Sequence, residues 1–541
     1  MAQLDAPLST FHSTELAPVL ASIAAASREI AAALAHGALR GHHGEVGENN
    51  VQGEAQQRLD VFADQVMRRH LLESGAVAAV ASEEEEGLHL CSEPGRPWLV
   101  AGDVLVPMAF IAQTLHELGA SSVLALGVSR GMGDLPDPDV IPQVHGPGIV
   151  APDTMTGIRM AGEVLADLPP DLRAAVEAFD PRKEARAVTP LYFDGRPVAG
   201  RSVLGARPQA WRDLEDKIII DAFWDAAGIP RSPSRIVAPA AGELEAAFDA
   251  LDVHGLGVVL AADARDGFHG AAHGVRWMRE RSMAGELAAH FAASADLVRV
   301  MPFLEGIPCS IHGIVLPDGT RAVRPCEMVV LRKPGKAELH YAQAATFWDP
   351  ADADREAMRD LARRTGEHLR RTVGYRGVFT VDGVMTVHGF RPTELNPRYG
   401  AAISILSKGL PELPLYLLHL LIADGADLDW RGDDLERVLL ASGDANRQGS
   451  GSVVTKREFT ETHRRSLVHD GVWRWAEDGE EAHATFTIGP NPAGGYGKVI
   501  LVPEHTPVGP SVAPRIADAL MFVDREFDLG LGPLEPAKAV R

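Results

Sequence analysis

The spacing of apolar residues along the chain predicts an alternation of helices and strands. Apolar side chains three or four positions apart indicate helices over 14–36 and 54–73, and a glycine follows each of them closely. Two apolar runs, "WLVAGDVLVP" and "SSVLALGVSR", indicate strands, with a helix in "MAFIAQTLHELGA" between them. This strand–helix–strand order favours a small parallel α/β unit.

The pattern changes farther along the chain. There the sequence predicts a helix over 212–228, alternating strands and turns over 254–340 with one helix near 280–293, an amphipathic helix over 352–373, and a closing helix near 511–525. The region from about 440 to the end is rich in Gly and Pro and looks separate from the rest. We therefore expect an α/β and α+β multidomain protein.

Composition and charge narrow the class of protein. The 541 residues suggest about three or four domains. The net charge of −22 repels nucleic acid and anionic membrane, so we expect neither as a partner. The three cysteines are widely separated and the N-terminal residues lack a signal-peptide pattern, so we expect a cytoplasmic protein without disulfides.

The clearest chemical pattern lies in residues 377–400, "GVFTVDGVMTVHGFRPTELNPRYG". Polar and apolar residues alternate as in strands, and a turn centred on His388 would place Asp382 opposite Glu394. Asn396 and Arg398 would project from the same face. Oxygen ligands of this kind suit Mg²⁺, which keeps waters and phosphate oxygens, and Arg398 can clamp an anion.

A second interpretation of the same stretch stays open. Asp382 and Gly383 form an Asp-Gly pair that is also typical of a tight turn, and Glu394 would then be an ordinary surface carboxylate. Pro392 and Pro397 indicate that the second strand is irregular or lies at a sheet edge.

The stretch "FTVDG…PTELNPRYG" resembles the metal-binding hairpin of the ATP-grasp superfamily. The resemblance implies that Asp382, Glu394 and Asn396 hold Mg²⁺ and that Arg398 contacts the phosphates of ATP. Other segments follow in the order of that family. "EDKIIIDAFWDAAGIPRSPS" resembles its phosphate-binding lysine segment, here with Lys217.

Two further segments resemble parts of the nucleotide site in that superfamily. "DARDGFHGAAHGVRWM" resembles its phosphate-covering loop, and "VRVMPFLEGIPC" resembles the hinge beside the adenine. The residues implied are Gly267, Gly270 and Gly274 in the loop, backbone groups of Pro302, Phe303 and Leu304 at the base, and Glu305 at the ribose. All three segments also have a simpler interpretation. Lys217 could be a surface lysine, the loop a hairpin turn, and the hinge a core strand.

One position departs from the family pattern. The second lysine of the superfamily would stand just before the loop, where this chain has Ala261 and Ala262. Arg265, His269 or His273 could replace it, although a histidine has no fixed charge at neutral pH.

Within the superfamily the chain is most similar to the pheganomycin-type peptide ligases, a resemblance carried by "SIHGIVLPDG", "RPCEMVVLRK" and "GPSVAPRIADALMFVDREFDLGLG". It implies a pre-ATP-grasp domain over 97–200, an ATP-grasp domain over 201–430 and a C-terminal ligase-type domain over 431–541, with Glu327 and Arg332 near the site. The implied activity is ATP- and Mg²⁺-dependent ligation of a small-molecule carboxylate to an amine through an acyl phosphate. A homodimer is a further expectation.

The first ninety residues resemble a different family. "ENNVQGEAQQRLDVFADQVMRRHLLESGAVAAVASEEEEG" is similar to the N-terminal part of class I fructose-1,6-bisphosphatase, with Glu83 and Glu84 at its acidic metal-binding pair. The later Asp-Pro-x-Asp-Gly-Ser motif of that family is absent. We expect residues 1–92 to form a mainly helical module. A sugar-phosphate phosphatase and a non-catalytic nucleotide-binding regulatory protein remain the alternative functions.

Overall fold

The structure is a computed structural model of the chain. It describes residues 17–35, 45–49, 55–74, 77, 79–82, 84, 88–90, 96–120, 122–190, 192–265, 267, 270, 272–400, 402–411, 413–426 and 431–539.

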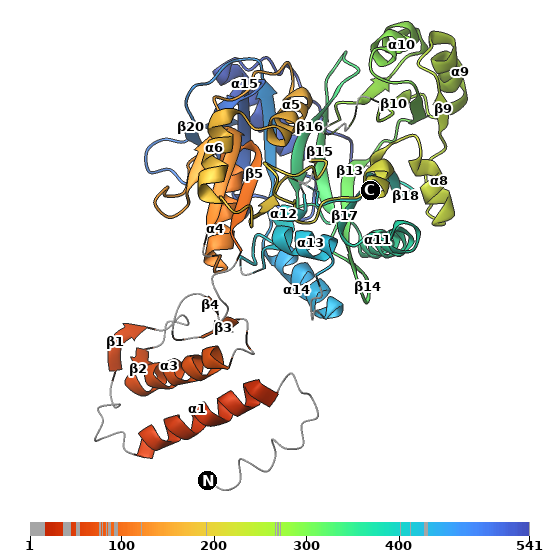
Figure 1. Ribbon diagram of the computed structural model, residues 1–541. Helices are drawn as coiled ribbons and strands as arrows, with labels where there is room; N and C mark the ends of the chain where they lie inside the picture. Colours follow the sequence, from red (N-terminus) through yellow and green to blue (C-terminus); the bar gives the residue numbers. More distant parts are fainter. Residues whose placement is uncertain are drawn as a thin grey trace.

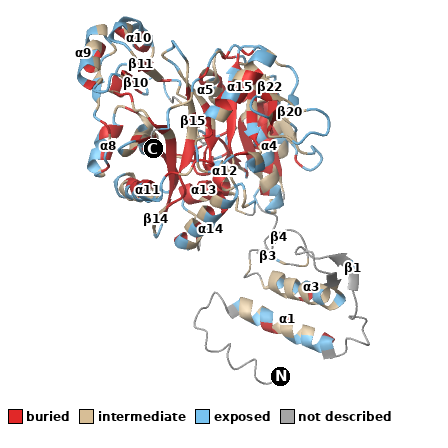
Figure 2. Cartoon of the chain, turned by 180° about the vertical axis from the view of Figure 1, so that it is seen from behind, coloured by how far each residue is buried: buried red, intermediate tan, exposed pale blue. Residues whose placement is uncertain are grey.

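Two helices near the N-terminus lie against each other and apart from the rest of the chain (Figure 1). They are α1 (Ala17–Ala35) and α3 (Arg58–Glu73), and the small strand pairs beside them are β1 (Glu45–Asn49) with β2 (Ala55–Gln57) and β3 (Ala79–Ala81) with β4 (Leu88–Leu90). The predicted helices are confirmed, although the second begins at Arg58 rather than at 54. Figure 2 shows few buried residues here, so the two helices have only a small core of their own.

The predicted parallel α/β unit is confirmed. The sheet order is β7-β6-β5-β8, all parallel. Its elements are β5 (Trp98–Val104), α4 (Leu105–Glu117), β6 (Val123–Ser129), β7 (Gln143–His145), α5 (Thr154–Ala166), α6 (Pro170–Phe179) and β8 (Arg186–Val188). Helix α4 starts directly after β5, and a Cβ at Gly127 would lie 2.5 Å from the backbone nitrogen of Leu105. Only glycine therefore lets β6 pass so close to the start of α4.

The next unit is a four-stranded antiparallel sheet of order β11-β10-β12-β9, with two helices packed on it. Its elements are β9 (Arg235–Val237), α9 (Ala241–Leu251), β10 (Val258–Ala262), β11 (Val275–Met278), α10 (Ala284–Ala292) and β12 (Val298–Pro302). The helix predicted over 212–228 was wrong. Two short helices, α7 (Gln209–Arg212) and α8 (Ile220–Ala226), are separated by a turn in which Asp216 Oδ1 accepts a hydrogen bond from the Ile218 amide.

The central antiparallel sheet has the order β16-β15-β13-β17-β18, with β14 beside β13. Its elements are β13 (Ile307–Leu316), β14 (Gly319–Ala322), β15 (Cys326–Arg332), β16 (Leu339–Ala345), α11 (Asp352–Val373), β17 (Gly377–Thr386), β18 (Gly389–Asn396), α12 (Ile403–Leu406), α13 (Leu415–Asp424) and α14 (Gly432–Ala445). Helices α8 and α11 cover one face and α12–α14 cover part of the other. The uncovered part of that second face carries the candidate site.

The C-terminal region, expected to look separate, shares a core with the central sheet. Its elements are β19 (Ser450–Thr455), β20 (His463–His469), β21 (Trp473–Trp475), β22 (Ala484–Asn491), β23 (Gly494–Leu501) and α15 (Ala513–Phe527). Val329 of β15 and Ala342 of β16 pack with Leu520 of α15 in one apolar cluster. The mixed α/β and α+β multidomain class is confirmed. None of the described helices has the length and apolarity needed to span a bilayer.

Candidate nucleotide and metal site

The hairpin of β17 and β18 places two carboxylates opposite each other. Asp382 pairs with Glu394 in the antiparallel ladder, as predicted, and Asp382 and Gly383 lie inside β17 rather than in a turn. Pro392 and Pro397 had indicated that the second strand of the hairpin is irregular or lies at a sheet edge, and β18 is an edge strand of its sheet.

A bulge at Thr393 produces this register. Gly383 pairs with Pro392, whereas its neighbour Asp382 pairs with Glu394, so Thr393 is the extra residue of β18. The Thr393 hydroxyl donates to the Asp382 carbonyl at 3.2 Å. The actual turn lies between Thr386 and Gly389, and the bulge restores the pairing that a turn centred on His388 would give.

Asp382 is held by two donors on the cleft face of the sheet. Ser310 Oγ donates to its Oδ1 at 2.5 Å, and Asn396 Nδ2 donates to its Oδ2 at 2.8 Å. Burial, together with the negative charge of Glu394, raises the pKa of Asp382 to about 7. A cation between the two carboxylates would remove this repulsion.

Lys217 reaches the same carboxylate pair from another part of the chain. It lies in the turn that separates α7 from α8, and its side chain is 10% exposed. Its Nζ lies 2.9 Å from Glu394 Oε1. The break in the predicted helix therefore directs a buried ammonium to the hairpin.

A chain of ion pairs positions Arg398. Its Nη2 donates to Asn396 Oδ1 at 3.1 Å, and its Nε donates to Glu215 Oε2 at 3.2 Å. Arg207 binds the other oxygen of Glu215. Burial alone would raise the pKa of Glu215, but the Arg398 and Arg207 guanidiniums hold it below its ordinary value. Two cations share one carboxylate here, which leaves net positive charge beside the hairpin.

These side chains line a cleft of about 550 Å³ between the central sheet and the sheet of β10. One end carries the polar groups of Asp382, Glu394, Asn396, Arg398 and Lys217. The other end is lined mainly by apolar and aromatic residues, among them Val259, Met301, Phe303, Leu304, Val330, Leu339 and Val384. An apolar slot beside a charged end suits a flat base attached to phosphates.

The apolar end is supported by an aromatic and cationic stack. Phe303 stacks on Trp277 with ring centroids 4.1 Å apart, and Arg332 lies over Phe303 at 5.1 Å. Glu305, whose contact with the ribose stays a prediction, binds Arg332 and accepts a hydrogen bond from the Lys538 amide at 3.2 Å. Pro302 is buried at the end of β12 and pairs with Val258.

The glycine-rich loop borders the cleft. Gly270 and Gly274 line it, and Gly267 lines an adjoining cavity. Ala261 and Ala262, in the place of the second lysine, are buried in β10. Arg265 pairs with Asp296 at 2.8 Å, whereas His273 lines the cleft 3.7 Å from Asp153. His269 lies outside the described residues.

Several cleft residues were not found by sequence reasoning. Arg207 belongs to no quoted motif, and Glu215 begins the segment of Lys217 but was given no role there; only the fold brings the two side chains to Arg398. His312, fully buried, contacts Thr380 Oγ1 through Nδ1 at 2.8 Å, and its Nε2 has no partner among the described residues. Burial lowers the pKa of His312 to about 3, so it is neutral.

Glu327, expected near the site, instead binds Ser511 and the Val512 amide before α15.

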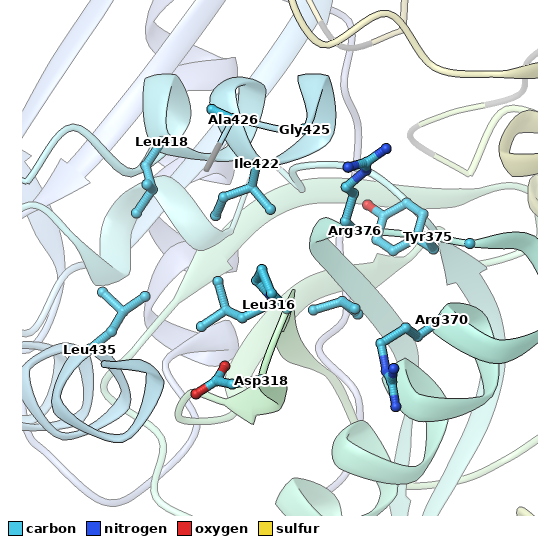
Figure 3. Close-up of a pocket in the computed structure, with 13 residues that line it drawn as sticks. Leu316, Asp318, Arg370, Tyr375, Arg376, Leu418, Ile422, Gly425, Ala426 and Leu435 are labelled. Carbon is cyan, nitrogen blue, oxygen red and sulfur yellow. The ribbon is translucent and has the colours of Figure 1, made fainter. Parts of the chain in front are cut away.

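A second cavity, of about 490 Å³, lies near the start of β17 (Figure 3). Its apolar wall includes Leu418 and Ile422 of α13. Asp318 in its wall pairs with Arg321, and Arg370 pairs with Glu367. It shares no lining residue with the cleft of the hairpin.

The donor set of the cleft fits Mg²⁺. No group of three or more His, Cys, Asp or Glu side chains suited to a metal occurs in the described part of the chain. Asp382 and Glu394 supply two carboxylates and Asn396 a carboxamide oxygen. Mg²⁺ commonly takes one or two carboxylates and completes its shell with water and substrate phosphates, so two facing carboxylates are sufficient.

Fold and cleft together define a multidomain α/β protein with an acidic, cation-lined cleft between two sheets. The family model for the fructose-1-6-bisphosphatase N-terminal domain matches residues 4–105. The class 1 fructose-1,6-bisphosphatase of Cellvibrio japonicus is 43% identical over 91 residues, which is 17% of this chain and 28% of that protein. The enzyme of Alkalilimnicola ehrlichii is 44% identical over 92 residues, with the same coverage. The predicted N-terminal resemblance is confirmed, and the chain spans about 28% of these relatives.

Solved structures with a similar arrangement cover most of the chain. Carboxyaminoimidazole ribonucleotide synthase of Aspergillus clavatus, complexed with ATP, has a TM-score of 0.45 and 12% identity, and covers 80% of this chain and 99% of its own. The biotin carboxylase domain dimer of Hydrogenobacter thermophilus 2-oxoglutarate carboxylase, with MgADP, ADP and bicarbonate, has a TM-score of 0.49 and 13% identity, with 82% and 92% covered. Because these TM-scores are below 0.5, the interpretation of the cleft depends on its own side chains.

Proposed function

We propose that the protein is an ATP- and Mg²⁺-dependent ligase of the ATP-grasp type that joins a small-molecule carboxylic acid to an amine. One observation carries this proposal. Asp382 and Glu394 face each other in a cleft, with Lys217 and Arg398 beside them and an apolar slot at the other end. Facing carboxylates and convergent cations are the groups that a metal-bound polyphosphate needs.

The cleft offers a separate place for each part of the nucleotide. The base would lie in the apolar slot at Phe303 and Leu304, and the phosphates would extend toward Lys217 and Arg398. Asp382, Glu394 and Asn396 would hold Mg²⁺, which when bound neutralises charge on the phosphate oxygens. Gly270 and Gly274 have no side chain to keep their backbone from an anion.

The reaction would need positioning and charge compensation rather than a side-chain nucleophile. An oxygen of the substrate carboxylate would attack the γ-phosphorus of ATP, giving an acyl phosphate and ADP. The amine would then attack the acyl carbon, release inorganic phosphate and lose a proton. Lys217 and Arg398 would offset negative charge during phosphoryl transfer, and Glu215 with Arg207 would hold Arg398 in place.

The proposal includes the domain boundaries 1–92, 97–200, 201–430 and 431–541.

Two alternative functions remain beside the ligase. The N-terminal match raises a phosphatase as an alternative, but the cleft described above lies outside residues 4–105. The alanines at 261 and 262 leave a nucleotide-binding protein without catalysis as the other alternative. A homodimer stays a prediction.

Thermal unfolding with and without Mg²⁺-ATP tests nucleotide binding. A ligand at 100 times its dissociation constant adds about 2.7 kcal/mol to the free energy of unfolding. We expect this shift in the wild type, its loss in Glu394→Ala, and its retention in the control Glu477→Ala, which removes an exposed carboxylate. Hydroxylamine can then trap acyl phosphates as hydroxamates across a panel of acids. A wild type with no shift in any acid mixture would refute the ligase.

A further inference from the structure

A third cavity, of about 730 Å³, adjoins the nucleotide cleft and is the one that Gly267 lines. It shares Lys217 and Glu394 with the cleft, so a ligand in this cavity would lie beside the phosphate end of the cleft. Its wall comes from α5, α7 and the segments around residues 192–196 and 207. This is the place from which an acid could approach the phosphoryl group under the proposed function.

Three guanidinium groups in this wall have buried nitrogens that lack a partner. The Nε atoms of Arg159, Arg207 and Arg212 are buried and donate to no acceptor among the described residues. Arg207 as a whole is only 8% exposed. A buried donor without an acceptor costs free energy, so each calls for an oxygen ligand.

The other cations of the wall are already neutralised. Arg196 pairs with Glu163 and Asp194, and Lys217 pairs with Glu394. Arg207 shares Glu215 with Arg398.

Arg159 and Arg212 differ from these cations. Neither has a carboxylate partner in the described part of the chain, and Arg212 Nη2 donates to the neutral Gln209 Oε1 at 2.5 Å. The acidic neighbours face other donors: Asp213 accepts from Gln209, Asp216 from the Ile218 amide, and Asp263 from the Asp296 and Leu297 amides. Arg159 and Arg212 are therefore the two cations of the wall without a carboxylate partner among the described residues, although seven Asp and Glu side chains line this cavity against five Arg and Lys.

We infer that this cavity binds an acid that carries a second anionic group, which Arg159 and Arg212 hold while the reacting carboxylate lies toward Lys217 and Arg398. The inference rests on the proposed function for the fate of the reacting carboxylate, but the anion site itself does not require ATP. A guanidinium binds carboxylate and phosphate with the same forked geometry. The second group is therefore a carboxylate or a phosphate.

Calorimetric titration of the full chain without ATP tests the anion site directly. The probes are butyrate with one anionic group, glutarate with a second carboxylate, and 3-phosphonopropionate with a phosphonate. A charge-assisted hydrogen bond to a buried arginine corresponds to about tenfold to a hundredfold in affinity. We expect at least one of the two dianions to bind about tenfold more tightly than butyrate, and the tighter of the two identifies the second group.

Variants assign the preference to the two arginines. Arg159→Gln and Arg212→Gln should each lose the preference, and Arg159→Lys should recover part of it. The control is Arg196→Gln, which removes a guanidinium of the same wall that already has its carboxylates. Equal affinity of all three probes for the wild type, or a preference that survives in both glutamine variants, would overturn the inference.

The same titrations separate this inference from the ligase proposal. Selective dianion binding together with no Mg²⁺-ATP shift would support the anion site and overturn the ligase. A Mg²⁺-ATP shift with no dianion preference would support the nucleotide site and overturn the second-anion specificity.

Discussion

Replacing Asp382 by Asn should make the metal-free protein less sensitive to pH. The pKa of Asp382 is raised from its ordinary value of 3.8 to about 7, so the folded protein binds a proton that the unfolded chain has lost. The stability from this group is fully present below about pH 4 and is lost as the pH rises through 7. Asp382→Asn is nearly isosteric and cannot ionise.

The magnitude follows from the linkage between pKa and stability. At 1.36 kcal/mol for each tenfold change, a pKa raised from 3.8 to about 7 corresponds to roughly 4 kcal/mol. The side chain is only partly buried, and Lys217 on the neighbouring carboxylate offsets some of the repulsion. We therefore expect about half of this, about 2 kcal/mol of unfolding free energy lost between pH 5 and 8 in the wild type and retained in Asp382→Asn.

Urea unfolding in EDTA at pH 5 and pH 8 measures this difference. Asp139→Asn, an exposed aspartate, controls for loss of a surface charge. Added Mg²⁺ should raise the stability of the wild type at pH 8 more than that of Asp382→Asn, because the substitution removes one of the two carboxylates that would hold the cation. An identical loss between pH 5 and 8 in wild type and Asp382→Asn would refute the account of a strained carboxylate pair.

Three further predictions concern other parts of the structure. Lys217→Met should lower the rate of ATP-dependent hydroxamate formation by at least about a hundredfold, since about 2.7 kcal/mol or more of transition-state stabilisation is lost; an unchanged rate of ADP release would remove Lys217 from the mechanism. Phe303→Ala should reduce the free energy of unfolding by about 3 kcal/mol and raise the KM for ATP more than it lowers kcat, and an unaltered KM would exclude the apolar slot as the base site. Asp180→Asn leaves buried Arg201 without its carboxylate and should lower the free energy of unfolding in urea by about 3 kcal/mol, with the KM for ATP unchanged. A loss of less than about 0.5 kcal/mol, which is the range of ordinary surface substitutions, would contradict a stabilising role of this ion pair.

Local patterns in the sequence predicted the elements that depend on local chemistry. The helix α11 has the predicted bounds 352–373, because its apolar spacing is regular and Gly374 ends it in the left-handed region. The pairing of Asp382 with Glu394 was predicted because strand alternation is visible in the sequence on both sides of one short turn.

Features that depend on tertiary packing were not predictable in the same way. The helix expected over 212–228 is broken at Lys217, because Asp216 caps a turn there and Trp211 and Trp224 pack into the central core. Arg207 and Glu215 lie far from Arg398 in sequence, and no periodicity links them. Glu327 was placed by resemblance, whereas the structure uses it to bind the start of α15.

The bulge at Thr393 makes the length of β18 functionally critical. Phe390 and Leu395 both pack into the core below the sheet although they are five positions apart. In a regular strand, residues an odd number of positions apart point to opposite faces. Deleting one residue at the bulge would therefore turn Glu394, Asn396 and Arg398 into the core or pull Leu395 out of it. Insertions and deletions in this hairpin should be tolerated only between Thr386 and Gly389, where the chain reverses before the polar face begins.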